Sequence, residues 1–499
     1  MADTKREIER KYEADGGGLP DLTGVGPVAA VLDRGVVELD ATYYDTADER
    51  LSTASLTLRR RTGGSDAGWH LKFPVAPGVR DEIRAPLGDT VPEEIAALVR
   101  SRVRDRELVP LVRLRSARDV RHLVDASGTL LAEASLDTVT AERPTGRGGT
   151  VRWTEIEVEL ADGGDPALLD RLDERLRAAG LRPSASPSKL ARALAETAPD
   201  RPGKPAGPAA PVTAGDHVLA YLRAQRDALV ALDPAVRRGI PDSVHRMRVA
   251  TRRARSTLRT FTGVLDRAVT GPVGAELKWL AGELGVDRDQ EVLADRLTSA
   301  LDALPPALVT GPVPQRLTAW AEARRGARAH LTGVLDSRRY LALLDALDAL
   351  LAEPPLRAAA GRAPKKALTK AVRKDERKLT ALMEHALALP PGQERDGALH
   401  EARKKAKRTR YAAEAATEAL GAPARALTKA MKSLTTLLGD HQDGVMARRT
   451  LRELAAVAHA AGESAFTYGL LFGREEARAA RLEAELAERW RRIGGRLSG

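Results

Sequence analysis

Carboxylate and cationic side chains surround a single isoleucine near the start of the chain, in the stretch EIERK. If these residues form a β-strand, Glu7, Glu9 and Lys11 point to one face, and Ile8 and Arg10 point to the other. Carboxylate oxygens bind hard divalent cations, and ammonium or guanidinium groups pair with phosphate oxygens. Such a face could hold a metal ion together with a phosphate compound.

The same division into a charged face and an apolar face recurs in later segments. The charged faces comprise Glu7, Glu9 and Lys11; Arg59 and Arg61; His70 and Lys72; Glu82 and Arg84; Arg113 and Arg115; Glu133 and Asp137; and Glu155, Glu157 and Glu159. The opposite faces comprise Ile8, Leu58, Leu71, Ile83, Leu114, Leu136, Ile156 and Val158. Acids dominate the first and last strands and bases the middle ones, whereas a surface that serves only solubility usually mixes the signs.

Two arrangements are compatible with this pattern. One is a half-solvated antiparallel sheet with its apolar face inward. The other is a closed barrel with a charged lumen, covered outside by helices at VPEEIAALVRSRV and DPALLDRLDERLRAAGL. Unpaired ions in a lumen would each cost several kcal/mol, so the tunnel must be wet or must hold a ligand that pairs with both signs. A polyphosphate with bound Mg²⁺ or Mn²⁺ meets that requirement.

The elements that carry these residues divide the chain into two domains. About nine short alternating strands, bounded by Gly, Pro and Asp, favour a barrel or a sandwich over residues 1–197. A segment rich in Pro, Gly and Ala, residues 198–214, is typical of a linker. Residues 215–499 show apolar spacing of about 3.6 residues, and roughly ten helices are expected. The predicted fold class is a two-domain α+β protein, with an N-terminal antiparallel β-barrel tunnel with outer helices and a C-terminal all-α duplicated helical bundle.

The duplication is visible as an internal repeat with an offset of 154 or 155 residues. VHRMRVATRRARS aligns with LHEARKKAKRTRY, and LKWLAGELGVDRD aligns with MKSLTTLLGDHQD, which places the two copies at about 215–353 and 362–495. His245, Arg248, Arg252, Arg255 and Arg259 form one helical stripe, which His400, Arg403, Lys407 and Arg410 repeat. A stripe of like charges is usually a solvated face, but its recurrence with Lys278 and Lys432 favours an anion-binding surface.

Composition narrows the class of partner. The net charge of +11 belongs to the helical part, because residues 1–200 carry 29 Lys and Arg against 35 Asp and Glu, and the remainder carries 51 against 34. Aromatic residues make up only 3%, which makes nucleic acid an unlikely ligand and favours a polyanion without bases. The absence of cysteine excludes thiolate chemistry. Without a signal peptide or a long apolar run, we expect a cytoplasmic protein that does not insert in a membrane.

The N-terminal part resembles the CYTH domain, the triphosphate tunnel metalloenzymes, which include thiamine triphosphatases, a class of adenylate cyclases and inorganic tripolyphosphatases. EIERK, LTLRRR, WHLKFP, EIEVEL and SKLARAL follow in the family's order over residues 3–197. The resemblance implies metal ligands at Glu7, Glu9, Glu157 and Glu159, with Glu155 less certain, and phosphate contacts at Lys11, Arg59, Arg61, Lys72, Arg113, Arg115 and Lys189. Of these, Glu7, Glu9, Lys11 and Lys72 would be catalytic. Lys189 would close the tunnel or is an ordinary helix-end lysine; Asp137 is either an outer metal contact or a surface residue, and His70 is expected to be a spectator.

The helical part resembles the CHAD domain over residues 215–495, most specifically at HRMRVATRRAR and HEARKKAKRTRY. The resemblance implies an inorganic polyphosphate-binding surface made by His245, Arg248, Arg252, Arg253, Arg255, Lys278, His400, Arg403, Lys404, Lys407, Arg408, Arg410 and Lys432. Gln442 departs from the pattern because it replaces a base of the first copy. The two helix histidines either hydrogen-bond phosphate or buttress the bundle.

Together, these patterns indicate a Mg²⁺- or Mn²⁺-dependent hydrolase of inorganic tripolyphosphate or short polyphosphate, whose helical domain binds polyphosphate and could associate with polyphosphate granules. A non-catalytic granule binder is the first alternative. Adenylate cyclase, nucleoside triphosphatase or thiamine triphosphatase activity in the same tunnel is the second.

Overall fold

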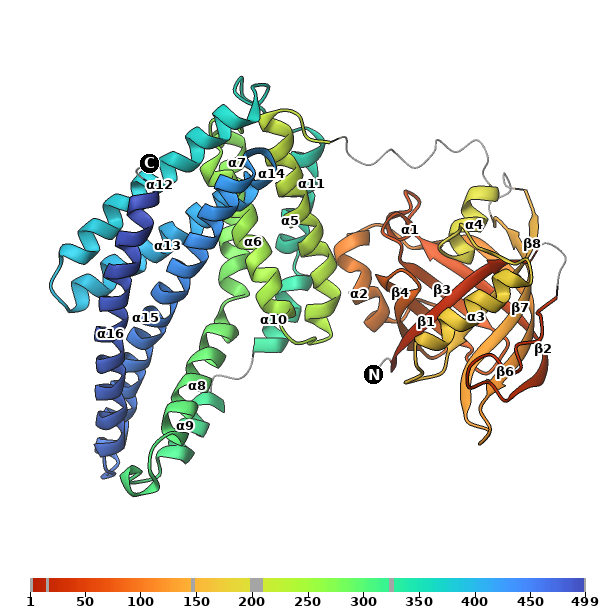
Figure 1. The fold of residues 1–499 in the computed structure, drawn as a ribbon, viewed down its shortest axis with the longest axis horizontal. Coiled ribbons are helices and arrows are strands. Elements are labelled where there is room, and N and C mark those ends of the chain that lie inside the picture. Colours follow the sequence, from red (N-terminus) through yellow and green to blue (C-terminus); the bar gives the residue numbers. More distant parts are fainter. Residues whose placement is uncertain (1–2, 15–17, 145–148, 198–209, 323–326, 498–499) are drawn as a thin grey trace. The chain divides into compact units, whose positions relative to one another are not determined.

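The computed structural model describes residues 3–14, 18–144, 149–197, 210–322 and 327–497. The chain forms two compact units, Met1–Gly207 and Pro208–Gly499 (Figure 1). Of the predicted linker, residues 198–209 lie outside the described residues. No helix in the described ranges combines the length and the apolar character needed to span a membrane.

The first unit is an antiparallel barrel. Its strands are β1 (Asp3–Glu13), β2 (Ala30–Asp45), β3 (Thr57–Thr62), β4 (Gly68–Ala76), β5 (Val79–Ala85), β6 (Val109–Val124), β7 (Leu130–Glu142), β8 (Val151–Leu160) and the short β9 (Arg182–Pro183). The order is β5-β4-β3-β2-β6-β7-β8-β1-β9, and β1 also pairs with β5, so strands β1 to β8 close on themselves. The predicted barrel is confirmed.

One expected strand boundary is wrong. The alternation predicts LVRLRS and VRHLVD as two separate strands, but both belong to β6. β6 pairs along its length with β2 and β7, and this pairing supplies backbone hydrogen bonds across the polar stretch. Neighbouring strands therefore decide the continuity of β6.

In the described part of the first unit, four helices accompany the barrel: α1 (Arg50–Thr53), α2 (Glu93–Val103), α3 (Ala167–Ala178) and α4 (Lys189–Glu196). The outward apolar residues of β3, β4 and β5, including Leu58 and Leu71, pack with the buried side of α2. Those of β1, β7 and β8, including Ile156 and Val158, pack with α3. In Figure 1 both helices lie against the outside of the strands.

Helix α4 closes one end of the barrel interior. Its Leu190 and Leu194 form one cluster with Val112, Leu114 and residues from the inward faces of β2, β7 and β8. The helix begins where the Ser188 side chain accepts a hydrogen bond from the Ala191 backbone N–H. The barrel lumen is thus apolar at this end and charged beyond it.

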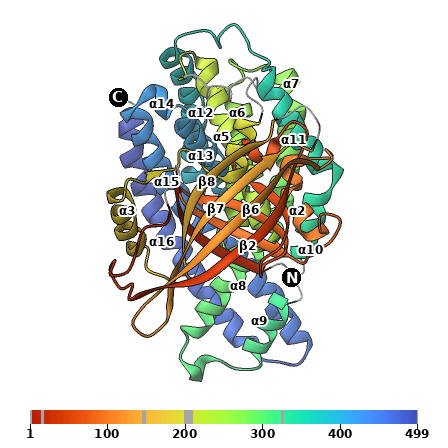
Figure 2. The same ribbon diagram turned by 90° about the vertical axis from the view of Figure 1, so that its right-hand side faces the viewer.

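The second unit is helical. Its helices are α5 (Ala214–Arg237), α6 (Ser243–Thr260), α7 (Arg267–Glu283), α8 (Val286–Asp302), α9 (Val313–Glu322), α10 (Ala327–Asp336), α11 (Arg338–Ala352), α12 (Pro364–Ala388), α13 (Gln393–Ala415), α14 (Thr417–Leu420), α15 (Ala422–Ala460) and α16 (Phe466–Leu497). One core joins α5, α6, α7 and α11, and a second joins α12, α13, α15 and α16. Both views show α15 and α16 running side by side (Figure 2). The helical bundle is as predicted.

Removing a buried contact between α3 and the barrel tests this architecture. Leu172 is 0% exposed within the α3 cluster. We expect Leu172→Ala to lower the free energy of unfolding of the barrel unit by about 2–5 kcal/mol, because a buried cavity replaces the side chain. Urea denaturation followed by tryptophan fluorescence measures the change. Leu32→Ala, at a position that is 44% exposed, is the control and should cost little; equal losses would contradict the packing of α3.

Candidate functional site

The barrel encloses a cavity of about 530 Å³, within the usual range for ligand sites. Its cationic lining residues are Lys5, Lys11, Arg34, Arg59, Arg61, Lys72, Arg80, Arg84, Arg118 and Lys189. Its acidic lining residues are Glu7, Glu9, Asp66, Glu133, Glu157 and Glu159. The charged faces of most strands therefore point inward, and the half-solvated sheet is the wrong alternative. Cations outnumber acids in the lining, which favours a polyanionic ligand.

The opening residues of the chain lie in this wall. Glu7 and Glu9 are buried on the inward face of β1, whereas Ile8 packs outward with the α3 cluster. The Lys72 Nζ donates to Glu7 Oε2 at 2.5 Å, and the Lys11 Nζ donates to Glu157 Oε1 at 2.5 Å. Burial raises the pKa of Glu7, against the effect of Lys72. The EIERK strand thus supplies both acids and a base to the lumen.

Behind the cationic wall lies a buried anion, Glu82, with no exposed surface. It accepts from Arg84 Nε at 2.5 Å and lies 3.6 Å from Lys72 Nζ and 3.7 Å from Arg59 Nη2. His70 Nδ1 hydrogen-bonds Glu82 Oε1 at 2.9 Å. Burial, with Arg59 nearby, lowers the pKa of His70 to about 4, so the ring is neutral near pH 7. His70 faces Glu82 and does not line the cavity, whereas Arg59 and Lys72 do.

Lys189, at the start of α4, lies on a group of three carboxylates. Its Nζ is 2.9 Å from Asp137 Oδ2, 2.6 Å from Glu155 Oε1 and 2.6 Å from Glu157 Oε1. Burial favours the protonated form of Glu157, but Lys11, Lys189 and Arg118 together hold its pKa well below the usual range. This geometry ties the helix that closes the barrel to the acidic wall.

These acids are suited to a divalent cation. The ligand oxygens of Asp137, Glu155 and Glu157 lie within 4.8 Å of one another, and hard cations bind carboxylate oxygens. Glu7 and Glu9, two of the predicted ligands, line the cavity but pair with Lys72 and Lys11. The fourth predicted ligand, Glu159, also lines the cavity, and Lys5 donates to it. Asp137 is fully buried and is therefore not a surface residue.

The structure places two predicted phosphate contacts outside the lumen. Arg113 donates to Asp40 through Nε at 2.9 Å and Nη2 at 2.5 Å, and Arg115 Nη2 donates to Glu142 at 3.0 Å. All four residues are absent from the cavity lining. The reason is that Leu114 faces inward beneath α4, so the charged neighbours on either side of it must face out. The inward assignment of Arg113 and Arg115 is wrong.

Arg118 is the inward cation that the sequence reasoning missed on β6. It donates to both oxygens of Asp137 at 2.7 Å and to Glu157 at 2.7 Å. It has the same strand parity as Leu114, which the alternation had assigned outward. Three other missed lining cations are Lys5, Arg34 and Arg80, whereas Arg84 lines the cavity as its place on the charged face predicts. Lys5 shares the parity of Glu7, and Arg80 shares that of Glu82, so the pattern contained these two.

In the helical unit, α6 packs against α13, so the charged stripes of the two repeats meet. We call Arg248, Arg252, Arg403, Lys407 and Arg410 the basic cluster. Burial and these four arginines lower the pKa of Lys407 to about 7. Among the described residues, the buried Nε of Arg403 has no hydrogen-bond partner. Like charges held together in this way favour an anionic ligand.

Glycines at equivalent positions support the repeat. A Cβ at Gly285 would lie 2.8 Å from Arg248 Nη2, and one at Gly439 would lie 3.6 Å from Arg403 Nη2. The two arginines and the two glycines are related by the offset found in the sequence. Each repeat thus uses a glycine to admit the guanidinium group of its stripe.

The predicted phosphate-binding residues of the helical unit also make contacts outside the basic cluster. Arg253 and Arg410 are both paired with Glu414, at 2.9 and 3.3 Å. Arg408 lies 3.3 Å from Asp375, and Lys404 pairs with Glu401. Burial lowers the pKa of Arg255, and the nearby charges of Arg259 and Arg408 lower it further. His400 Nδ1 hydrogen-bonds Gln442 Oε1 at 2.7 Å, so Gln442 contacts the stripe although it is not a base. His245, Lys278 and Lys432 are exposed.

Comparisons with known proteins give two family matches. A model of the CYTH domain matches residues 5–194, and a model of the CHAD domain matches residues 220–452. The uncharacterized protein Rv2226 of Mycobacterium tuberculosis is 41% identical over 503 residues, which cover 97% of this chain and 94% of that protein. Protein MT2285 of a second strain gives the same values.

Solved structures similar to this chain include PptA from Streptomyces chartreusis and the CHAD domain from the plant Ricinus communis. PptA is 23% identical and covers 56% of this chain and 100% of its own, with a TM-score of 0.49. The plant domain is 25% identical and covers 58% of this chain and 95% of its own, with a TM-score of 0.43.

The assignment of Arg118 to the inner face of β6 and of Arg115 to its outer face can be tested by anion binding. We expect Arg118→Gln to weaken tripolyphosphate binding by about 10-fold or more, the cost of one charge-assisted contact, and Arg115→Gln to leave it unchanged. Isothermal titration calorimetry on the full chain measures both. Because Arg118 also pairs with buried acids, Lys5→Gln serves as a second variant, and near-ultraviolet circular dichroism checks folding. Weaker binding in Arg115→Gln alone would reverse the assignment.

Proposed function

The chain belongs to the family of proteins that carry CYTH and CHAD domains, and from this premise we propose that its barrel is a divalent-metal-dependent hydrolase of inorganic tripolyphosphate or short polyphosphate. The helical unit then binds polyphosphate. The observation that carries this proposal is a lumen that brings cationic side chains and buried carboxylates together.

The cations of the lumen hold and orient the phosphate chain. Arg59 and Lys72 are anchored from behind by Glu82, so their charged groups are fixed before a ligand arrives. Burial, with Arg59 and Arg118 nearby, lowers the pKa of Arg61 to about 9, and phosphate oxygens would relieve this repulsion. The ligand replaces interactions that these groups now make with acids.

The acids hold the metal ion. Glu7, Glu9, Glu157 and Glu159 are the proposed ligands, and Asp137 with Glu155 extends the set beside Glu157. When bound, Mg²⁺ or Mn²⁺ neutralises phosphate oxygens and activates water, so no nucleophilic side chain is needed. Lys11 and Lys189, which lie on these acids in the structure, would turn to the phosphate chain.

The lining supports an inorganic substrate over a nucleotide. Among the described residues, Tyr43 is the only Phe, Tyr or Trp that lines the cavity, and its hydroxyl accepts a hydrogen bond from Arg59 Nη1 at 3.3 Å. A purine ring would therefore find no aromatic stacking cluster. This favours tripolyphosphate over ATP as the substrate.

Phosphate release tests the catalytic proposal. With Mg²⁺ or Mn²⁺ and tripolyphosphate, ATP or thiamine triphosphate, we expect tripolyphosphate to react fastest and a chelator to abolish release. Glu9→Gln should lower kcat by about 100-fold or more, above the loss typical of an outer metal contact. Asp170→Asn, which removes an acid paired with the outward Arg10, is the control and should keep its activity. Binding without any release would leave a polyphosphate-binding protein instead of an enzyme.

The basic cluster of the helical unit predicts how polyphosphate binding depends on pH. With a pKa of about 7, Lys407 is mostly charged at pH 6 and mostly neutral at pH 8. Because a polyanion binds the charged form, the Kd for long-chain polyphosphate should rise about 10-fold from pH 6 to pH 8. Fluorescence anisotropy at constant ionic strength measures it.

Lys407→Arg separates this lysine from other titrating groups. Arginine stays charged, so its Kd should be nearly independent of pH over this window. The groups that face Lys407 are Arg248 and Arg252 from α6, Arg403 and Arg410 from its own helix, and Asp443 from α15. A pH dependence that persists in Lys407→Arg would assign the effect to a group other than Lys407.

A further inference from the structure

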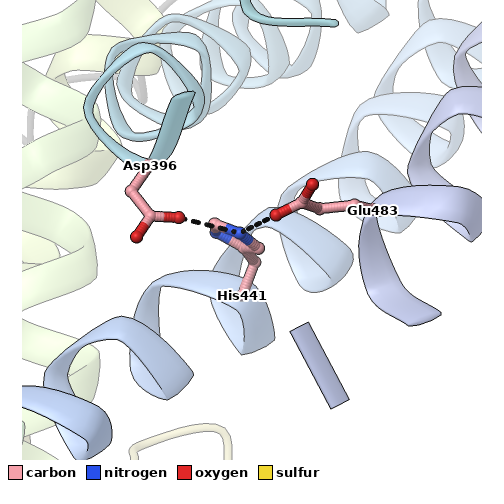
Figure 3. A group of neighbouring side chains, drawn as sticks. All are labelled: Asp396, His441 and Glu483. Atoms are coloured by element: carbon pink, nitrogen blue, oxygen red, sulfur yellow. Dashed lines mark hydrogen bonds and ion pairs between the residues drawn. The ribbon is translucent and has the colours of Figure 1, made fainter. Parts of the chain in front are cut away.

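Three helices of the CHAD unit bring a histidine and two carboxylates together (Figure 3). His441 of α15 lies between Asp396 of α13 and Glu483 of α16. Its Nε2 is 3.3 Å from Asp396 Oδ1 and 3.2 Å from Glu483 Oε1. His441 is 2% exposed, and the side chains of the two acids are 18% and 12% exposed. These three residues, the His441 cluster, share no residue with the basic cluster or the barrel lumen.

The spacing of the three donor atoms matches a metal site. Nitrogen and oxygen ligands bind Zn²⁺ at roughly 2.0–2.2 Å, so two ligands of one tetrahedral ion lie about 3.3 Å apart. The nitrogen-to-oxygen distances of 3.2 and 3.3 Å agree with this value. All three donor atoms lie within 4.8 Å of one another, so only the two carboxylate oxygens need to approach.

Two arginines hold the outer oxygens of the carboxylates. Arg448 Nη2 donates to Asp396 Oδ2 at 2.9 Å, and Arg395 Nε lies 3.2 Å from Glu483 Oε2. Each acid thus uses one oxygen for an arginine and turns the other to His441. Outer contacts of this kind orient the ligands of metal sites.

We propose that the His441 cluster binds one divalent transition-metal ion, with Zn²⁺ strongly preferred over Mg²⁺. One imidazole and two carboxylates form a mixed nitrogen and oxygen set, which suits Zn²⁺, whereas Mg²⁺ takes oxygen ligands almost exclusively. Bound there, the ion joins α13, α15 and α16. Asp396 precedes His400 by one helical turn, so the ion fixes the end of the α13 stripe that carries Arg403 and Lys407.

Equilibrium dialysis of the full, chelator-stripped chain against Zn²⁺ tests this site, with millimolar Mg²⁺ present to fill oxygen-only sites. We expect one tightly bound Zn²⁺ per chain. His441→Ala and Glu483→Gln should weaken that binding by about 100-fold or more, whereas the tunnel variant Glu157→Gln should retain it. The site is independent of hydrolysis, so failure here leaves the proposed enzyme intact.

His400→Ala is the matched control, because His400 also joins α13 to α15 but pairs with an amide instead of two acids. It should bind Zn²⁺ as the wild type does. Co²⁺ substitution adds a readout, since a histidine-containing site of low coordination number gives strong visible absorption that His441→Ala should lose. Thermal melting in the absence of metal verifies that each variant folds. Zn²⁺ binding that is equal in the wild type and His441→Ala, or no Zn²⁺ binding, would overturn the proposal.

Discussion

The structure of the barrel depends on the cost of enclosing charge in a closed sheet. Side chains alternate between the two faces of a strand, so a lumen lined by ions requires an apolar exterior, and α2 and α3 cover that exterior. Inside, each buried ion must have a partner of opposite sign. The pairs Lys72–Glu7 and Lys11–Glu157 meet this need, and Glu82 serves several cations at once. A ligand can enter only by exchanging these contacts for others.

The basic cluster of the helical unit groups charges of one sign, unlike the barrel lumen. This difference bears on the ligand that is proposed for each unit. In the basic cluster, burial and the four surrounding arginines lower the pKa of Lys407 to about 7. An anion alone is enough to stabilise such a group of like charges. The lumen holds both signs in quantity, so it gains most from a ligand that brings both, a phosphate chain with its metal ion. Polyphosphate, the proposed ligand, would therefore suit both units for different electrostatic reasons.

Alternation in the sequence predicted the inward face correctly in the strands whose lumen-facing charges follow one another at every second position. β1, β3 and β8 are such strands, and Glu7, Arg59 and Glu157 face the lumen as expected. β6 failed because its inward face changes from Leu114 to Arg118 where the cap by α4 ends, a change that only the position of α4 explains. The repeat gave both stripes, but their meeting across α6 and α13 is a tertiary contact without a local pattern. The same holds for Asp396, His441 and Glu483, which lie more than 40 residues apart in sequence.

Lys189 connects the closing of the barrel to the occupation of its acids. Its ammonium group pairs with Asp137, Glu155 and Glu157, while Leu190, one residue on, anchors α4 in the apolar end of the lumen. Burial opposes the charge of Lys189, but these acids raise its pKa, so it stays protonated. A divalent ion bound by the same carboxylates would have to displace this ammonium group, because like charges at such distances repel strongly. The nearest new partner for the released charge is a phosphate oxygen in the cavity that Lys189 lines, so metal and phosphate would bind cooperatively.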